Sequence, residues 1–86
     1  MRILSRFYDC DVPYEHVILK VRRNGVAYEL VALYPGTNVI QPLYSSEDKE
    51  DVCDIMEYIN DMYCGGSRTV VVEADEEEDS KLRRII

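Results

Sequence analysis

Two β-rich runs joined by an Asn-Gly dipeptide constrain the fold of this chain more than any other feature. Residues 15–23 and 26–34 are rich in Val, Leu, Ile and Tyr, and Asn24-Gly25 lies between them. Asn and Gly tolerate a positive φ, which both central residues of a type I′ turn require. The sequence therefore predicts a β-hairpin whose two-residue turn is Asn24-Gly25.

This turn also predicts how the two strands pair. Leu19 is expected opposite Leu30 on one face of the hairpin, which is the natural core face, and Lys20 opposite Glu29 on the other. The second face carries further apolar side chains that need a cover, whether a terminal segment, a second chain or a partner protein. These side chains are a possible dimer interface, comprising Ile18, Val31 and Leu33.

A long amphipathic helix is predicted next. Ser45-Ser46 supplies a hydroxyl N-cap, the acids that follow suit a first helical turn, and Gly65-Gly66 marks the end. Between these limits, apolar side chains recur at steps of three and four residues, which is typical of a buried helical stripe. The stripe comprises Val52, Ile55, Met56, Ile59, Met62 and Tyr63. We expect it to cover the core face of the hairpin.

The remaining segments complete an α+β domain. Residues 3–8, 39–44 and 68–74 are predicted strands, and residues 9–13 a turn. Pro42 indicates an edge position for the second of these strands, and the apolar run of the third favours a central one. The predicted fold is an antiparallel sheet of four to five strands with the helix on one face, in the order hairpin, helix, strand. Residues 1–74 form this single domain, and residues 75–86 a flexible tail, acidic and then basic and apolar.

Negative charge is concentrated in one part of the chain. The formal net charge is −7, yet residues 45–79 hold thirteen Asp and Glu against two Lys and Arg, while residues 1–44 hold four acids and five cations. A field of one sign repels phosphate and attracts basic surfaces, so neither nucleic acid nor an anionic membrane is an expected direct partner. The three cysteines lack paired spacing, which favours free thiols in the cytoplasm over a disulfide framework.

One short stretch invites a catalytic or metal-site interpretation. Cys10 lies between Asp9 and Asp11, with His16 nearby. A nucleophile needs an adjacent, oriented base, and zinc needs three or four converging ligands, and this spacing is diagnostic of neither. Asp is also common in turns that precede a proline. The chain carries no phosphate loop and no hydrolase or metalloprotease motif. We therefore predict no catalytic residue, no metal and no cofactor.

The acids of the predicted helix form the main candidate site. Glu50, Asp54, Glu57 and Asp61 recur at i, i+4, i+7 and i+11, in one column away from the apolar stripe, and Lys49 is the only cation on the helix. Neighbours in such a column lie about 6 Å apart. This regular series of negative charges resembles the phosphates of a nucleic-acid strand. The predicted partner-binding residues are Glu47, Glu50, Asp51, Asp54, Glu57, Tyr58, Asp61, Glu76, Glu77 and Glu78.

Two functions follow from this surface. The preferred one is a non-enzymatic inhibitor that occupies the basic, nucleic-acid-binding surface of a partner protein or nuclease complex by mimicry. In size and charge the chain is similar to the small acidic inhibitors that phages make against host defence, anti-CRISPR proteins among them. The alternative is a small homodimeric structural or assembly protein whose acidic helix face only provides solubility.

Overall fold

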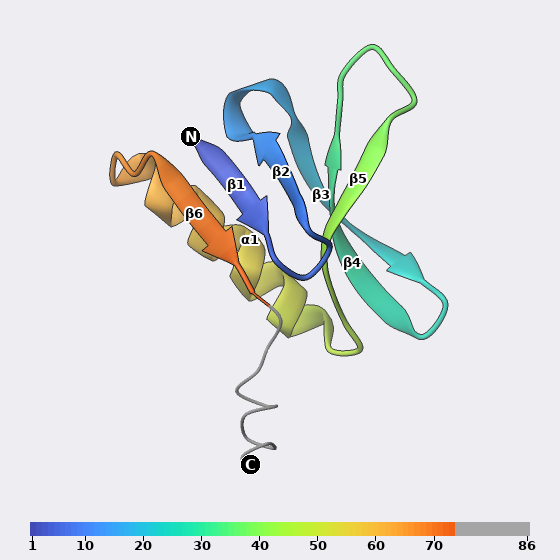
Figure 1. The fold of residues 1–86 in the computed structure, drawn as a ribbon. Coiled ribbons are helices and arrows are strands. Elements are labelled where there is room, and N and C mark those ends of the chain that lie inside the picture. The colour runs from blue at the N-terminus through green and yellow to red at the C-terminus, as the bar shows by residue number, and fades with distance from the viewer. Residues whose placement is uncertain (74–86) are drawn as a thin grey trace.

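Two three-stranded sheets and one helix make up residues 1–73, the part of the chain that the computed structural model describes (Figure 1). One sheet has the strand order β2-β1-β6 and the other β3-β4-β5. The predicted α+β class is confirmed, but the prediction of one sheet with four to five strands is wrong. The predicted tail, residues 75–86, lies outside the described residues. The elements are β1 (Arg2–Ser5), β2 (Cys10–Pro13), the 3-10 turn η1 (Tyr14–His16), β3 (Ile18–Asn24), β4 (Ala27–Leu33), β5 (Ile40–Ser46), α1 (Lys49–Cys64) and β6 (Thr69–Val72).

The β3-β4 hairpin turns one residue later than predicted. Asn24 pairs with Ala27, so Gly25 and Val26 form the two-residue loop. Gly25 has a φ of +68°, whereas Val26 keeps a negative φ. This is the pattern of a type II′ turn with glycine at its first central position, and it excludes type I′, which needs a positive φ at both. A β-branched residue such as Val strongly disfavours positive φ, which accounts for the choice of turn.

Because the turn comes later, each residue of β4 pairs with a residue of β3 two positions further along the chain than predicted. Each side chain still lies on the predicted face of the hairpin. Val21 lies opposite Leu30 and Arg22 opposite Glu29, so the predicted pairs of Leu30 with Leu19 and of Glu29 with Lys20 are wrong. Because side chains alternate with a period of two, a shift of two keeps the core side chains on the core face. The later register gives Glu29 a guanidinium partner in place of an ammonium.

A β-bulge in β5 places two consecutive apolar side chains in the core. Leu30 pairs with Tyr44 and Val31 with Pro42, so Leu43 is the additional residue of the bulge. Leu43 and Tyr44 are both buried. A bulge re-aims side chains in this way because the pleat is interrupted. Pro42 lies on an edge strand of the sheet, as predicted.

Side chains, rather than a further strand, cover the edge of β5 at this bulge. The Ser5 hydroxyl donates to the carbonyl oxygen of Leu43 at 2.6 Å, and Cys10 Sγ lies 3.8 Å from the carbonyl oxygen of Pro42. Ser5 and Cys10 pair with each other at the ends of β1 and β2. The end of one sheet thus packs on the edge of the other through side chains.

Three predictions fail in the sheet of terminal strands. β1 ends at Ser5, and residues 6–9 form a turn in which Asp9 has a φ of 55°. Most of the predicted turn at residues 9–13 is strand β2, antiparallel to β1. β6 runs parallel to β1 at the edge of the sheet and not at its centre. Its buried side chains, Val70 and Val72, alternate with more exposed ones, as expected for a strand with one covered face.

Helix α1 begins later than predicted. Ser45 and Ser46 belong to β5, and the N-cap is Asp48, whose carboxylate accepts a hydrogen bond from the Glu50 N–H at 2.9 Å. A carboxylate at this position also interacts favourably with the helix dipole. The predicted hydroxyl N-cap at Ser45-Ser46 is therefore wrong, although the start of a helix in this region is confirmed.

The predicted glycine stop of α1 is confirmed. Gly66 has a φ of +86° and donates to the carbonyl oxygen of Tyr63 at 3.0 Å. The next residue, Ser67, donates to the carbonyl oxygen of Met62, also at 3.0 Å. These two bonds form a Schellman motif, in which glycine is favoured because the residue after the helix is left-handed.

The helix shares one core with both sheets. Val52 and Ile59 are fully buried, whereas Tyr63 is 41% exposed, so its predicted place in the buried stripe is wrong. The helix packs mainly on β4 and β5 and less on β3, so part of the sheet face beside β3 stays open. The buried core comprises Ile3, Val12, Leu30, Ala32, Leu43, Tyr44, Val52, Ile59, Val70 and Val72.

Candidate acidic binding surface

The acidic column of α1 faces solvent. Its position follows from the buried stripe: with Val52 and Ile59 in the core, the opposite side of the helix points outwards. Each predicted partner-binding residue on or before the helix is exposed, and Tyr58 is 45% exposed. These residues are Glu47, Glu50, Asp51, Asp54, Glu57, Tyr58 and Asp61. The predicted contacts Glu76, Glu77 and Glu78 lie outside the described residues.

Within residues 1–73, no cation of the chain neutralises this column. The ion pairs there join Arg2 to Asp11, Arg6 to Glu73, Arg22 to Glu29 and the N-terminal ammonium to Glu15. All of these carboxylates lie outside α1, and the last helical turn carries no basic residue. Like charges at i, i+4 destabilise a helix slightly. Among the described residues, the column is thus a concentrated negative surface without ion pairs along one side of α1.

A groove of about 490 Å³ runs beside the column, between α1 and β3. Its apolar part is formed by Val17, Leu19 and Met56, and its acidic part by Glu57 and Asp61 from the column itself. Pockets of 300–1,000 Å³ are of the size that holds a small ligand or a few side chains. The acidic surface therefore includes a hollow with an apolar floor.

One aromatic residue, Tyr14, lines this groove. Tyr14 donates from its hydroxyl to Asn60 Oδ1 at 3.0 Å, and its ring stacks on that of Tyr63 with the centroids 4.4 Å apart. Stacked rings and a hydrogen bond hold the Tyr14 side chain in place. This explains why Tyr63, expected in the core, lies half exposed on the helix surface.

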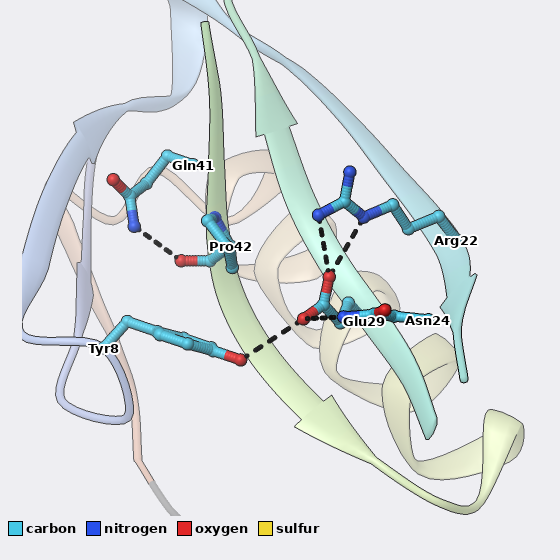
Figure 2. A network of polar contacts seen from close by, with 6 residues as sticks. All are labelled: Tyr8, Arg22, Asn24, Glu29, Gln41 and Pro42. Carbon is cyan, nitrogen blue, oxygen red and sulfur yellow. Dashed lines mark hydrogen bonds and ion pairs between the residues drawn. The ribbon is translucent and has the colours of Figure 1, made fainter. Parts of the chain in front are cut away.

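A second polar site lies on the sheet face away from the helix (Figure 2). Glu29 is 6% exposed, and its carboxylate accepts from Arg22 Nε at 3.0 Å, from Asn24 Nδ2 at 3.2 Å and from the Tyr8 hydroxyl at 3.5 Å. Burial, with the nearby Glu29 carboxylate, raises the pKa of the Tyr8 phenol. The donors surround the buried charge, as stability requires. This site ties the loop between β1 and β2 to the hairpin.

The three residues of the possible dimer interface differ in how far they are exposed. Ile18 is 55% exposed and Leu33 half-buried, whereas Val31 is only 1% exposed. Ile18 pairs with Leu33, which in turn pairs with Ile40, itself 45% exposed. The exposed apolar patch is therefore the row Ile18, Leu33 and Ile40 across three strands. The sequence did not single out Ile40 because its pairing partner depends on the bulge in β5.

The stretch around Cys10 holds no catalytic arrangement in the described structure. Burial raises the pKa of the Cys10 thiol, which lowers its thiolate fraction, and its sulfur contacts the Pro42 carbonyl oxygen rather than a base. The neighbouring Asp11 is paired with Arg2. Among residues 1–73, no three His, Cys, Asp or Glu side chains are grouped so as to hold a metal ion.

Sequence reasoning missed the groove, although it placed several of its residues on the correct faces. Leu19 and Met56 were expected in the core, and only the lateral position of the helix over the sheet leaves them at an open edge.

Comparisons with protein-family models, with curated proteins and with solved structures find no match to this chain. Nothing helical between residues 1 and 73 combines the length and apolar character needed to cross a bilayer.

Proposed function

We propose that this chain is a non-enzymatic protein-binding domain that occupies a basic, nucleic-acid-binding surface of a partner protein and inhibits it by mimicry. The observation that carries the proposal is the exposed column Glu50, Asp54, Glu57 and Asp61, which forms no ion pair within residues 1–73. Three free cysteines, Cys10, Cys53 and Cys64, fit a reducing compartment, and the cytoplasm is part of the proposal.

The helix holds the four carboxylates of the column in a regular row. The column extends over about 17 Å of helix, since each residue rises about 1.5 Å. Regular negative charges along a rod are what a nucleic-acid backbone offers to a Lys- and Arg-rich surface. The carboxylates form no ion pair within residues 1–73, so no ion pair among these residues has to break when a basic surface approaches. Tyr58, exposed on the same helix, adds an aromatic contact of the kind enriched at interfaces.

The test is capture of a partner from host lysate with the tagged chain, followed by displacement with nucleic acid. We expect a nucleic-acid-binding protein that is released by added DNA or RNA and by high salt, because the same cations bind both ligands. Neutralising the column with Glu50→Gln, Asp54→Asn, Glu57→Gln and Asp61→Asn is expected to abolish capture. A captured protein that nucleic acid does not displace, and that the neutralised variant still binds, contradicts the proposal.

A matched control removes the same charge from another surface. Asp9, Asp11, Glu15 and Glu73 are exposed and lie off the helix, so their replacement by Asn or Gln reduces the net negative charge equally. This replacement also removes the ion pairs of Asp11, Glu15 and Glu73. This control is expected to retain capture. The column variant should also be at least as stable as the natural chain, because about 0.2–0.5 kcal/mol of repulsion per neighbouring pair is removed. Urea unfolding of both variants therefore separates lost binding from lost folding.

The exposed row Ile18, Leu33 and Ile40 favours a second candidate function, a homodimeric structural protein. Exposed apolar side chains in neighbouring strands are a common basis of self-association. Sedimentation equilibrium of the natural chain and of Ile18→Lys with Ile40→Lys distinguishes the candidates. A dimer that this double variant dissociates, together with the absence of any nucleic-acid-displaceable partner, favours the second candidate.

A further inference from the structure

We propose that the groove between α1 and β3 binds an extended segment of the basic partner, which adds a strand to the free edge of β3. The inference rests on the proposed function and adds two details, the extended conformation of the bound partner segment and the pattern of side chains in that segment. β3 is an edge strand, and within residues 1–73 its backbone makes no hydrogen bond beyond those of its ladder with β4. Alternate N–H and C=O groups of such an edge point outwards, where a peptide can bind them.

The groove lies where this added strand would send its side chains. Val17 and Leu19 reach it from the β3 side and Met56 from the helix, so a peptide strand beside β3 directs every second side chain into the groove. Glu57 and Asp61 line the same space. An apolar side chain would contact the floor while a Lys or Arg two positions away, about 7 Å along the strand, reaches the carboxylates.

The opposite face of β3 selects against cations at the intervening positions. Ile18, Lys20 and Arg22 alternate there, and Lys20 is exposed. A bound strand therefore needs neutral residues between its groove-facing ones. Arg22 is paired with Glu29, so the unpaired cation of this face within residues 1–73 is Lys20. Lys20 also disfavours edge-to-edge pairing of two copies of β3, since like charges on neighbouring strands repel. The occupant that fits is a partner segment in which Lys or Arg and an apolar residue alternate with neutral residues.

The experiment uses the isotope-labelled full chain and the synthetic peptide Thr-Lys-Thr-Leu-Thr-Lys-Thr as the probe. We expect NMR shift changes at β3 and at the groove residues of α1, and slower amide hydrogen exchange at alternate residues of β3. A peptide with Glu in place of Lys should not bind. A peptide N-methylated at alternate backbone nitrogens should also fail, because it cannot extend the sheet. Binding of the N-methylated peptide with unchanged affinity would overturn the proposal.

Two double variants separate the groove from the rest of the column. Glu57→Gln with Asp61→Asn is expected to weaken probe binding roughly tenfold, as loss of two exposed ion pairs implies. Glu50→Gln with Asp54→Asn removes the same charge outside the groove and should weaken binding less, by about threefold at most, because these two carboxylates do not line the groove and contribute no direct ion pair. Equal weakening by both pairs would overturn the groove proposal while leaving capture of a basic partner, and so the proposed function, intact.

Other occupants of the groove give different results. Replacing Lys81, Arg83 and Arg84 by Gln in the full chain should leave the groove signals unchanged. If these substitutions shift the groove signals, the chain's own residues 81–84 occupy the groove and the partner-segment proposal fails. Groove signals that change with protein concentration alone would instead identify a second copy. Probe binding without any nucleic-acid-displaceable partner would refute the proposed function and retain the groove as a peptide site.

Discussion

Arg22 and Glu29 form an ion pair across the β3-β4 hairpin, with Arg22 Nε donating to Glu29 Oε1 at 3.0 Å (Figure 2). The carboxylate is almost fully buried, so it depends on its donors for stability. Arg22→Met is expected to lower the free energy of unfolding by about 1–3 kcal/mol, because a buried charge loses its main partner. Urea unfolding measures the change.

A second substitution tests whether the loss of stability in Arg22→Met comes from the Glu29 carboxylate, which is left without its main partner. Glu29→Gln in the Arg22→Met background removes that charge, so the double variant should be more stable than Arg22→Met alone. If the two substitutions destabilise the chain additively, the pair is not coupled and the guanidinium contributes through packing alone.

Alkaline stability should depend on Tyr8. Burial and the Glu29 carboxylate raise the pKa of its phenol, so the native state holds this proton to higher pH than the unfolded state does. The corresponding stability is complete below about pH 10, the ordinary tyrosine value, and is lost as pH rises through the native pKa. Urea unfolding at increasing alkaline pH should show a steeper loss for the natural chain than for Tyr8→Phe. Identical slopes would count against this linkage.

The parts of the fold that depend on local pattern could be predicted from the sequence. The faces of the hairpin follow from its alternating side chains, and the helix and its acidic column from spacing at three and four residues. The parallel pairing of β1 with β6 joins the two ends of the described chain, and no local pattern encodes it. Asp9 and Pro13 favour a turn on propensity, and only pairing with β1 makes most of that segment a strand.

Ser5 is expected to be essential to the junction of the two sheets. Its buried hydroxyl donates to the Leu43 carbonyl oxygen at 2.6 Å and accepts from the Tyr8 N–H at 3.2 Å. Ser5→Ala removes both bonds and should cost about 1–3 kcal/mol, as expected when buried polar groups lose partners. Thermal or urea unfolding measures this. Ser67→Ala is the control, because within residues 1–73 the Ser67 hydroxyl makes only a long contact to Met62 sulfur, and a similar loss there would contradict the assignment.

The cysteines should differ in reactivity. Cys64 is exposed, whereas Cys10 is half-buried and burial raises the pKa of its thiol. At about pH 8, iodoacetamide should therefore modify Cys64 first and Cys10 much later, since the thiolate is the reacting form. Peptide mass spectrometry over time measures the order, and the urea-unfolded chain, in which the thiols should react at similar rates, is the control. Fastest modification at Cys10 would indicate an activated thiol and revive the catalytic interpretation.

The glycine pair after α1 permits a test of backbone conformation without a change in packing. Gly66 has a φ of +86° and open space around its missing Cβ, so Gly66→Ala adds no clash and its cost is conformational. We expect a loss of about 1 kcal/mol, the usual penalty for a side chain in the left-handed region. Gly65 has a φ of −82°, and a Cβ there meets the Asp61 carbonyl oxygen at 3.4 Å, an ordinary contact. Gly65→Ala should thus be neutral or slightly stabilising, since alanine also restricts the unfolded chain. Urea unfolding of both variants decides the matter: equal losses would mean that the Schellman geometry does not set the end of the helix, and with it the point at which the chain turns back to form β6.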